Sequence, residues 1–399
     1  MTNTWLIKGI TIYSESSRIE NGYVLVTNGI ITDIGFCHSV PLISDISVIE
    51  LPAEFHLIPG MIDVHIHGAN GADVMDGTED SLATMACALP REGTTSFLAT
   101  TMTQKQELIE TALQNVSDYI DKPQAGDLAE VLGIHLEGPF ISEKRAGAQP
   151  KNYILEPNLP LFQKWQSIAK DRIKLVTLAP ERKGALPFIR YLKETGVIAS
   201  IGHSDATYGE VAAGIQAGVC HVTHLFNGMR GLHHREPGVV GAALLHREVK
   251  TEMIVDGIHI GSQMVKLAYQ SKGSEGILLI TDAMQAKCLG DGDYHLGGQE
   301  VTVEKGEARL KDGTLAGSIL RMGDAIRNMM DFTGCSLKDI VTMSSENPAK
   351  QLGVFDRKGS ICVGKEADLV VLDDKHEVIM TFCRGYLAYS KSSFPNGGR

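Results

Sequence analysis

Residues 59–68 read PGMIDVHIHG, and the fold prediction starts from this stretch. Its aliphatic residues indicate a short buried strand, and two histidines, His65 and His67, lie at the end of that strand. Because side chains alternate along a strand, both imidazoles point to the same face, where they can chelate one metal ion. A pair of histidines is a weak signal by itself, since two hydrogen-bonded polar residues give the same pattern.

Seven further aliphatic runs follow this strand, and segments with apolar residues at helical spacing separate them. The eight predicted strands are 57–65, 94–99, 131–136, 173–178, 197–201, 220–225, 251–255 and 276–280. The predicted helices include 81–91, 104–120, 161–170, 186–195, 208–216 and 262–270. Eight strands that alternate with helices predict an α/β fold, the (β/α)8 TIM barrel. Two long connections, 140–160 and 284–320, are expected to carry function.

The two ends of the chain predict a different structure. Residues 1–56 and 359–390 alternate apolar and polar residues with period two and show no helical pattern. Neither segment is large enough for a good core, so we expect both to combine into one small β-sandwich beside the barrel. The predicted organisation is a catalytic barrel over 57–358, flanked by the two parts of the sandwich, with a flexible tail over 391–399.

Composition excludes several classes of protein. Among 399 residues, Lys and Arg number 37 and Asp and Glu number 48, which gives a net charge of −11 without any long run of like charges. No apolar stretch approaches the roughly 20 residues of a membrane span, and the first residues lack the pattern of a secretory signal. The seven cysteines are scattered and never spaced CxxC, so neither a disulfide framework nor a thiolate metal cluster is expected. We therefore expect a cytoplasmic protein with neither a nucleic acid nor a membrane as partner.

Four other predicted barrel strands also end in a residue that can bind a metal. The C-terminal ends of barrel strands form the catalytic face, and a random polar set would rarely consist of histidine and carboxylate alone. The sequence therefore predicts a metal centre at this face. Its six predicted ligands are His65, His67, Glu137, His203, His224 and Asp282.

These residues resemble the ligand set of the amidohydrolase superfamily of metal hydrolases. The strings HLEGPF, KRAGAQ, GHSDAT, THLFNGM, HHREPG, DGIHI, TDAM and LAGS follow in this order. Together they are similar to the family in that superfamily that deacetylates N-acetyl-D-glucosamine 6-phosphate, and the similarity covers nearly the whole chain. It implies a hydrolase that cleaves the acetamide of this phosphorylated amino sugar to D-glucosamine 6-phosphate and acetate, in amino-sugar catabolism.

The resemblance implies a role for each predicted ligand. Glu137 would join His203 and His224 around one ion, while His65 and His67, which some members lack, imply a second ion bridged by Glu137. We therefore expect two divalent ions per chain. They are expected to be Zn²⁺ or Fe²⁺, because either metal suits imidazole and carboxylate ligands. Such an ion lowers the pKa of bound water from about 15.7 towards 7, so that hydroxide becomes the nucleophile. By resemblance, Asp282 is the general base and then the general acid, and it can be a metal ligand as well.

The resemblance also implies a set of substrate contacts. His259 would be catalytic, contacting the acetyl carbonyl oxygen and stabilising the developing oxyanion. Arg235 would bind the phosphate in the site of a neighbouring subunit, which implies a homodimer with shared active sites. His233 and His234 flank this arginine without an assigned role. The remaining expected contacts are Ala148, Gln149, Asn227, Gly228, Leu315, Ala316 and Gly317, and relatives can have a histidine where Gln149 stands.

Alternative functions stay open at this point. A cyclic amidohydrolase, similar to dihydroorotase or hydantoinase, would use nearly the same ligands, but such enzymes generally carry a carboxylated lysine after the fourth strand, where this chain reads VTLAPER. A deacetylase of another N-acetyl amino sugar phosphate is a further alternative. A binding protein without catalysis would be expected to lose ligands, and all six are present. Two more histidines are expected off the metal, with His135 one layer deeper and His221 on the face opposite His224.

Overall fold

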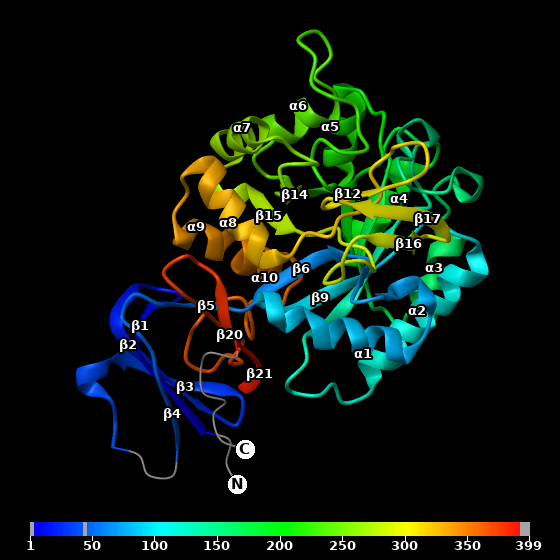
Figure 1. Cartoon of the computed structure of the whole chain (residues 1–399). Helices are drawn as coiled ribbons and strands as arrows, with labels where there is room; N and C mark the ends of the chain where they lie inside the picture. Colours follow the sequence, from blue (N-terminus) through cyan, green and yellow to red (C-terminus); the bar gives the residue numbers. More distant parts are fainter. Residues whose placement is uncertain (1–3, 43–45, 392–399) are drawn as a thin grey trace.

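The computed structural model describes residues 4–42 and 46–391, and a barrel forms its larger part (Figure 1). Eight parallel strands pair in the order β15-β14-β13-β12-β11-β10-β9-β6, and a bridge between Ile66 and Ala283 brings the two ends of this sheet together. This arrangement confirms the predicted (β/α)8 barrel. The strands are β6 (Met61–Ile66), β9 (Thr94–Thr101), β10 (Glu130–Glu137), β11 (Ile173–Leu178), β12 (Ile198–Ile201), β13 (His221–Val222), β14 (Lys250–Ile254) and β15 (Ile277–Ile280).

Helices surround the barrel because helical segments, most of them amphipathic, follow its strands. The main ones are α1 (Glu79–Ala88), α2 (Gln106–Asp121), α3 (Leu159–Ile168), α4 (Ala185–Glu194), α5 (Tyr208–Ala217), α6 (Gly238–Leu245), α7 (Ser262–Lys272), α8 (Met322–Thr333), α9 (Leu337–Val341) and α10 (Asn347–Gln351). Local signals fix where they begin. The side chain of Thr207, for example, accepts from the backbone N–H of Glu210, and the side chain of Glu210 accepts from the backbone N–H of Thr207. These two bonds form a capping box, which starts α5.

Both chain ends form one β unit beside the barrel, as expected. Its strands are linked in a single sheet of order β21-β20-β19-β5-β1-β2-β3, with β4 beside β1, and this sheet has its own apolar core. They are β1 (Thr4–Tyr13), β2 (Arg18–Thr27), β3 (Ile30–Phe36), β4 (Ser47–Glu50), β5 (His56–Pro59), β19 (Leu369–Leu372), β20 (Val378–Cys383) and β21 (Tyr386–Ser390). Apart from Lys391, the predicted tail lies outside the described residues.

The first predicted strand, 57–65, is divided in the structure. Residues up to Pro59 belong to β5 in the end sheet, and the barrel begins with β6 at Met61. Gly60 marks the passage between the two units. A Cβ at Gly60 would lie 2.1 Å from Thr95 Oγ1, so only glycine allows the chain to pass this close to β9.

A small antiparallel sheet covers one side of the barrel mouth. It consists of β16 (Gly292–Leu296), β17 (Gln299–Glu304) and β18 (Glu307–Arg309), and it lies within the connection 284–320. Its apolar side chains pack on Met102 and Met284, and three glutamine amides bind it to the surrounding loops. Gln104, Gln285 and Gln299 donate to the backbone carbonyls of Gly297, His295 and Ala148.

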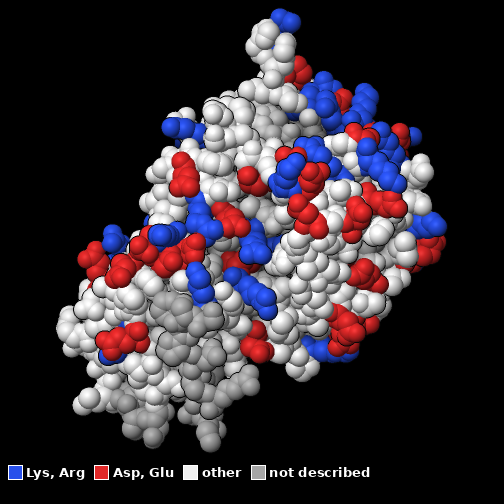
Figure 2. All heavy atoms as spheres, in the orientation of Figure 1, with Lys and Arg blue, Asp and Glu red and all other residues white. Residues whose placement is uncertain are grey.

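Within the described residues, no helix has the length and the apolar character that a membrane crossing requires. Acidic and basic side chains are mixed over the face shown in Figure 2.

Candidate active site

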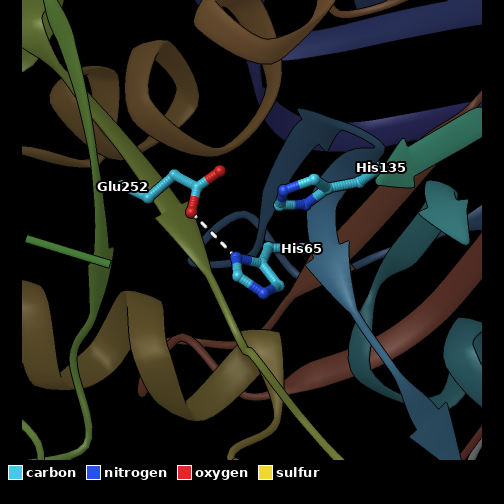
Figure 3. A group of neighbouring side chains, drawn as sticks. All are labelled: His65, His135 and Glu252. Carbon is cyan, nitrogen blue, oxygen red and sulfur yellow. Dashed lines mark hydrogen bonds and ion pairs between the residues drawn. The ribbon is translucent and has the colours of Figure 1, made fainter. Parts of the chain in front are cut away.

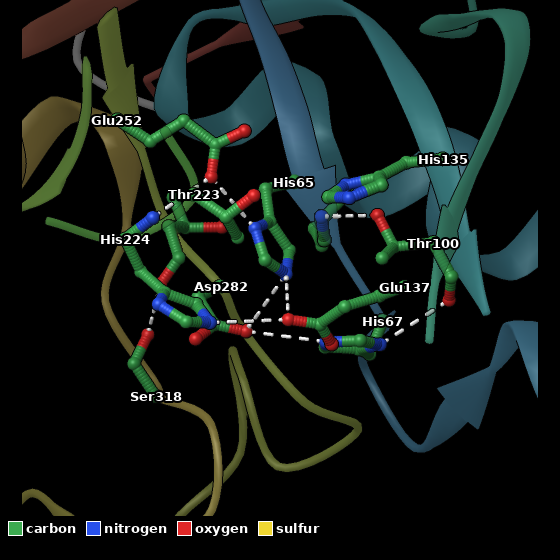
Figure 4. Close-up of polar contacts among 12 residues, drawn as sticks. His65, His67, Thr100, His135, Glu137, Thr223, His224, Glu252, Asp282 and Ser318 are labelled. Carbon is green, nitrogen blue, oxygen red and sulfur yellow. Dashed lines mark hydrogen bonds and ion pairs between the residues drawn. The ribbon is translucent and has the colours of Figure 1, made fainter. Parts of the chain in front are cut away.

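The six predicted metal ligands come together at the C-terminal mouth of the barrel, and Figure 4 labels all of them except His203. They form two groups, and within each group the possible donor atoms lie within 4.8 Å of one another. One group is Glu137, His203 and His224, and the other is His65, His67 and Asp282. All six are buried or nearly so, because the strand ends converge beneath the surrounding loops.

Glu137, at the end of β10, lies between the two groups. Its Oε1 is 3.1 Å from the Nε2 atoms of both His203 and His224, and its Oε2 is 3.2 Å from His67 Nε2. The Oδ1 of Asp282 is 3.2 Å from His67 Nε2 and 3.4 Å from His65 Nε2. A single carboxylate thus faces both sets of imidazoles.

All four histidines turn the same ring nitrogen towards the centre. Each Nδ1 lies near an acceptor, at 2.9 Å from Arg145 O for His203, at 3.0 Å from Asn227 O for His224 and at 3.2 Å from Thr100 O for His67. The Nδ1 of His65 lies 2.9 Å from Glu252 Oε2. These partners place the proton on Nδ1, so each Nε2 offers its lone pair to the centre.

The donor atoms fit divalent metal ions. His65 Nε2 is buried and makes no hydrogen bond within the described residues, and the carboxylate oxygens of Glu137 and Asp282 lie 3.4 Å from it, so a metal ion between these atoms would satisfy it. The Nε2 atoms of His203 and His224 face each other at 3.1 Å. Imidazole nitrogens together with carboxylate oxygens form the donor set that Zn²⁺ and Fe²⁺ share.

Electrostatics in the site favour positive charge. Burial alone would raise the pKa of Glu137 and Asp282, but the neighbouring histidines lower both pKa values. Burial alone would lower the pKa of His67, but the carboxylates of Asp282 and Glu137 raise it to about 9. The two carboxylates are therefore ionised, and the site attracts either protons or metal ions.

Backbone strain accompanies three of the ligands. His203, His224 and Asp282 have φ values of 47°, 30° and 49°, in the left-handed region that costs non-glycine residues of order 1–3 kcal/mol each. Backbone bonds hold this shape at Asp282, whose N–H donates to His65 O at 2.8 Å and whose carbonyl accepts from Ser318 N. The left-handed turn at His224 ends β13 after Val222, whereas the predicted strand runs to residue 225.

A cavity of about 370 Å³ opens above the ligands. Of the expected substrate contacts, Ala148, Gln149, Asn227, Gly228, His259, Leu315 and Gly317 line it. Ala316 is not among the lining residues, because it is buried in the apolar cluster beneath β16–β18. Gly228 has φ +57°, and a Cβ there would lie 3.0 Å from His203 Nδ1, so the close approach of this loop to the ligand requires glycine.

Two lining residues have internal partners. Gln149 donates from Nε2 to Glu137 Oε2 at 2.7 Å and accepts from Thr103 N, so it joins the cavity wall to the central carboxylate. His259 Nδ1 lies 2.6 Å from Asp256 Oδ2. Burial alone would lower the pKa of His259, but Asp256 raises it, so this imidazole holds a proton more firmly than an ordinary histidine.

Arg235 lies outside the cavity of its own chain. It belongs to the loop before α6, which extends away from the barrel at the top of Figure 1. Its side chain is exposed, and its Nη1 lies 2.8 Å from His234 Nε2.

Sequence reasoning missed several lining residues. Met102, Gly147, Leu296, Arg309 and Thr314 also line the cavity. Arg309 ends β18, donates to Glu307 and Gly313 O, and is the only Lys or Arg among these lining residues. No motif marks it, because the packing of β16–β18 over the barrel brings it there.

Comparisons with known proteins agree with this site. The model of the amidohydrolase family matches residues 56–388. The N-acetylglucosamine-6-phosphate deacetylase of Bacillus subtilis (strain 168) is 51% identical over 390 residues, 98% of each chain. The N-acetylgalactosamine-6-phosphate deacetylase of Escherichia coli O157:H7 is 37% identical over 96% of this chain and 99% of its own.

A solved structure extends the similarity to three dimensions. A variant of the N-acetyl-D-glucosamine-6-phosphate deacetylase from Mycobacterium smegmatis, in complex with N-acetyl-D-glucosamine-6-phosphate, has a TM-score of 0.90 at 30% identity. The match covers 98% of this chain and 100% of that one. By these similarities the chain belongs to the amidohydrolase family, among its N-acetylglucosamine-6-phosphate deacetylases.

Proposed function

We propose that this protein hydrolyses the acetamide of N-acetyl-D-glucosamine 6-phosphate to D-glucosamine 6-phosphate and acetate. The observation that carries the proposal is the convergence of four imidazole Nε2 atoms, Glu137 and Asp282, and all of these residues except His65 line one cavity. The cavity, of about 370 Å³, falls within the usual range for small-molecule sites.

Two divalent ions per chain, Zn²⁺ or Fe²⁺, are part of the proposal. Glu137, His203 and His224 would hold one, and His65 and His67 with Asp282 would hold the other, with Glu137 shared between them. When bound, such ions supply a water molecule activated for attack and polarise the amide carbonyl. The support is the buried Nε2 of His65, which makes no hydrogen bond within the described residues, and the facing donor atoms of the two groups.

Asp282 is the proposed proton carrier. Its Oδ1 faces His65 and His67, which leaves Oδ2 to take a proton from the attacking water and pass it to the departing amine. The lowered pKa of Asp282 keeps it ionised and ready to accept that proton. His259, with its proton held by Asp256, would donate to the acetyl oxygen as negative charge develops there.

The proposal assigns the phosphate to Arg235 of a neighbouring subunit in a homodimer, with Asn227 and Gly228 beside it. The exposed loop before α6 supports this, since its arginine does not contact the cavity of its own chain. We also propose a cytoplasmic location, because a charged sugar phosphate does not cross a membrane unaided.

Acetate release tests the function. The purified protein should release acetate from N-acetyl-D-glucosamine 6-phosphate, lose this activity on chelation and regain it with added Zn²⁺ or Fe²⁺. The similarity to an N-acetylgalactosamine-6-phosphate deacetylase makes N-acetyl-D-galactosamine 6-phosphate the necessary second substrate. Faster release from that isomer would reassign the sugar, and no release from either with metal bound would refute the proposal.

A further inference from the structure

A buried carboxylate lies directly beneath the proposed metal site. Glu252, in β14, is 0% exposed and points into the barrel interior. Its Oε2 is 2.9 Å from His65 Nδ1 and accepts from the backbone N–H of His224 at 3.1 Å. Its Oε1 is 2.9 Å from His221 Nε2. One carboxylate thus connects His65, on β6, to β13 and to a ligand of the other group (Figure 3 and Figure 4).

This contact distinguishes His65 from the other three histidine ligands. The Nδ1 atoms of His67, His203 and His224 lie against neutral backbone carbonyls, whereas that of His65 lies against a carboxylate. A carboxylate is the stronger acceptor, so it fixes the ring more firmly and makes the opposite nitrogen a better metal ligand.

His135 also approaches His65 and Glu252, but these three residues do not form a separate metal site. The Nδ1 of His135 lies 3.2 Å from Val64 O and its Nε2 lies 2.7 Å from Thr177 Oγ1, so both ring nitrogens are engaged. Since Glu252 also occupies His65 Nδ1, the group is a hydrogen-bonded layer under the ligands.

The charge of Glu252 has no fixed cation beside it. Within residues 4–42 and 46–391 its side-chain partners are the imidazoles of His65 and His221, which carry a charge only when protonated, and no Lys or Arg forms an ion pair with it. A divalent ion on the far side of the His65 ring would supply the compensating positive charge.

We propose that Glu252, held by His221, is the positioning residue of the ion site formed by His65, His67 and Asp282. This role rests on the two ions of the proposed function. Glu252 would be the group that makes the ion at His65, His67 and Asp282 bind tightly. Glu252 acts through His65 and touches neither substrate nor ion.

Metal content and chelator competition test this role. Glu252→Gln keeps the shape and one acceptor but removes the charge, and Glu252→Leu removes both. We expect the wild type to hold two ions. In each variant, the chelator concentration that removes one ion should be about 10- to 100-fold lower than in the wild type, and the concentration that removes the other ion should be unchanged. Ser200→Ala is the matched control, because Ser200 is equally buried in the same interior and, within the described residues, its side chain bonds only Thr223.

The outcomes separate the two ideas. If Glu252→Gln binds two ions with unchanged affinity, measured by elemental analysis after dialysis, the role of Glu252 is overturned and the proposed function still stands. A wild type that binds a single ion would overturn the two-ion part of the proposed function and this inference with it. Equal loss of both ions would also refute the proposal, because a merely structural role would weaken both sites alike. Glu252→Gln carries the test if Glu252→Leu fails to fold.

Discussion

Replacing Glu130 with glutamine should lower the free energy of unfolding by about 3 kcal/mol at pH 7. Glu130 begins β10 of the barrel, and its carboxylate meets two cations from the segment that leads into the end sheet. Its Oε1 is 2.9 Å from Arg357 Nη2, and its Oε2 is 2.8 Å from Lys358 Nζ. Lys358 is 1% exposed and Glu130 15%, so solvent screens this contact little.

The pKa of Glu130 provides the magnitude. Burial alone would raise it, but Lys358 and Arg357 lower it from the usual 4.5 to about 2. At about 1.4 kcal/mol for each pKa unit, this difference corresponds to about 3 kcal/mol of stability. Because the folded-state pKa is lowered, the contribution is complete above pH 4.5 and is lost as the pH falls towards 2.

Urea unfolding at several pH values measures this effect. Trp5 lies in the end sheet and Trp165 in α3, so their fluorescence reports on both units. The difference in the free energy of unfolding between wild type and Glu130→Gln should be about 3 kcal/mol at pH 7 and about half of that near pH 3. Glu20→Gln, whose ion pair is exposed, should change stability by less than about 1 kcal/mol. A difference below about 1 kcal/mol at pH 7, or a difference that does not depend on pH, would refute this role of Glu130.

Three further predictions concern the active site. Asp282→Asn should fold normally and bind substrate but lose at least about 100-fold in kcat, and a rate near wild type would remove its role as proton carrier. Arg235→Ala should raise KM for the phosphorylated sugar about 10- to 100-fold and leave KM for the unphosphorylated sugar unchanged; equal effects on both would make the residue structural. Replacing His65 and His67 together by alanine should reduce the metal content from two ions to one by elemental analysis, and an unchanged content would contradict the second site.

The barrel could be predicted because its strands are buried on both faces. They read as continuous aliphatic runs, and the predicted 173–178 coincides with β11. The prediction omits α6, whose sequence GVVGAALL is apolar on all sides and has no helical period. It also omits β16–β18, because short half-exposed strands inside a long connection differ little from a loop.

The clustering of the six candidate metal ligands could be predicted because each lies at the end of a barrel strand, where the fold itself brings them together. Glu252 gave a partial signal, since a glutamate inside the buried run TEMIV needs a partner. That partner, His65, lies on β6, two places along the barrel from β14, and no local pattern identifies it. Arg309 gave no signal at all.

The end sheet has a consequence for how the chain is made. His56 of β5 pairs with Leu372 of β19, so the N-terminal strands leave the ribosome long before the strand that completes their sheet. Until then the outer edge of β5 stays open, and open edges recruit other chains. Such distant pairing also slows folding. We expect the nascent chain to depend on chaperones until its last strands are synthesised, and truncation before β19 to yield aggregates rather than a free-standing barrel.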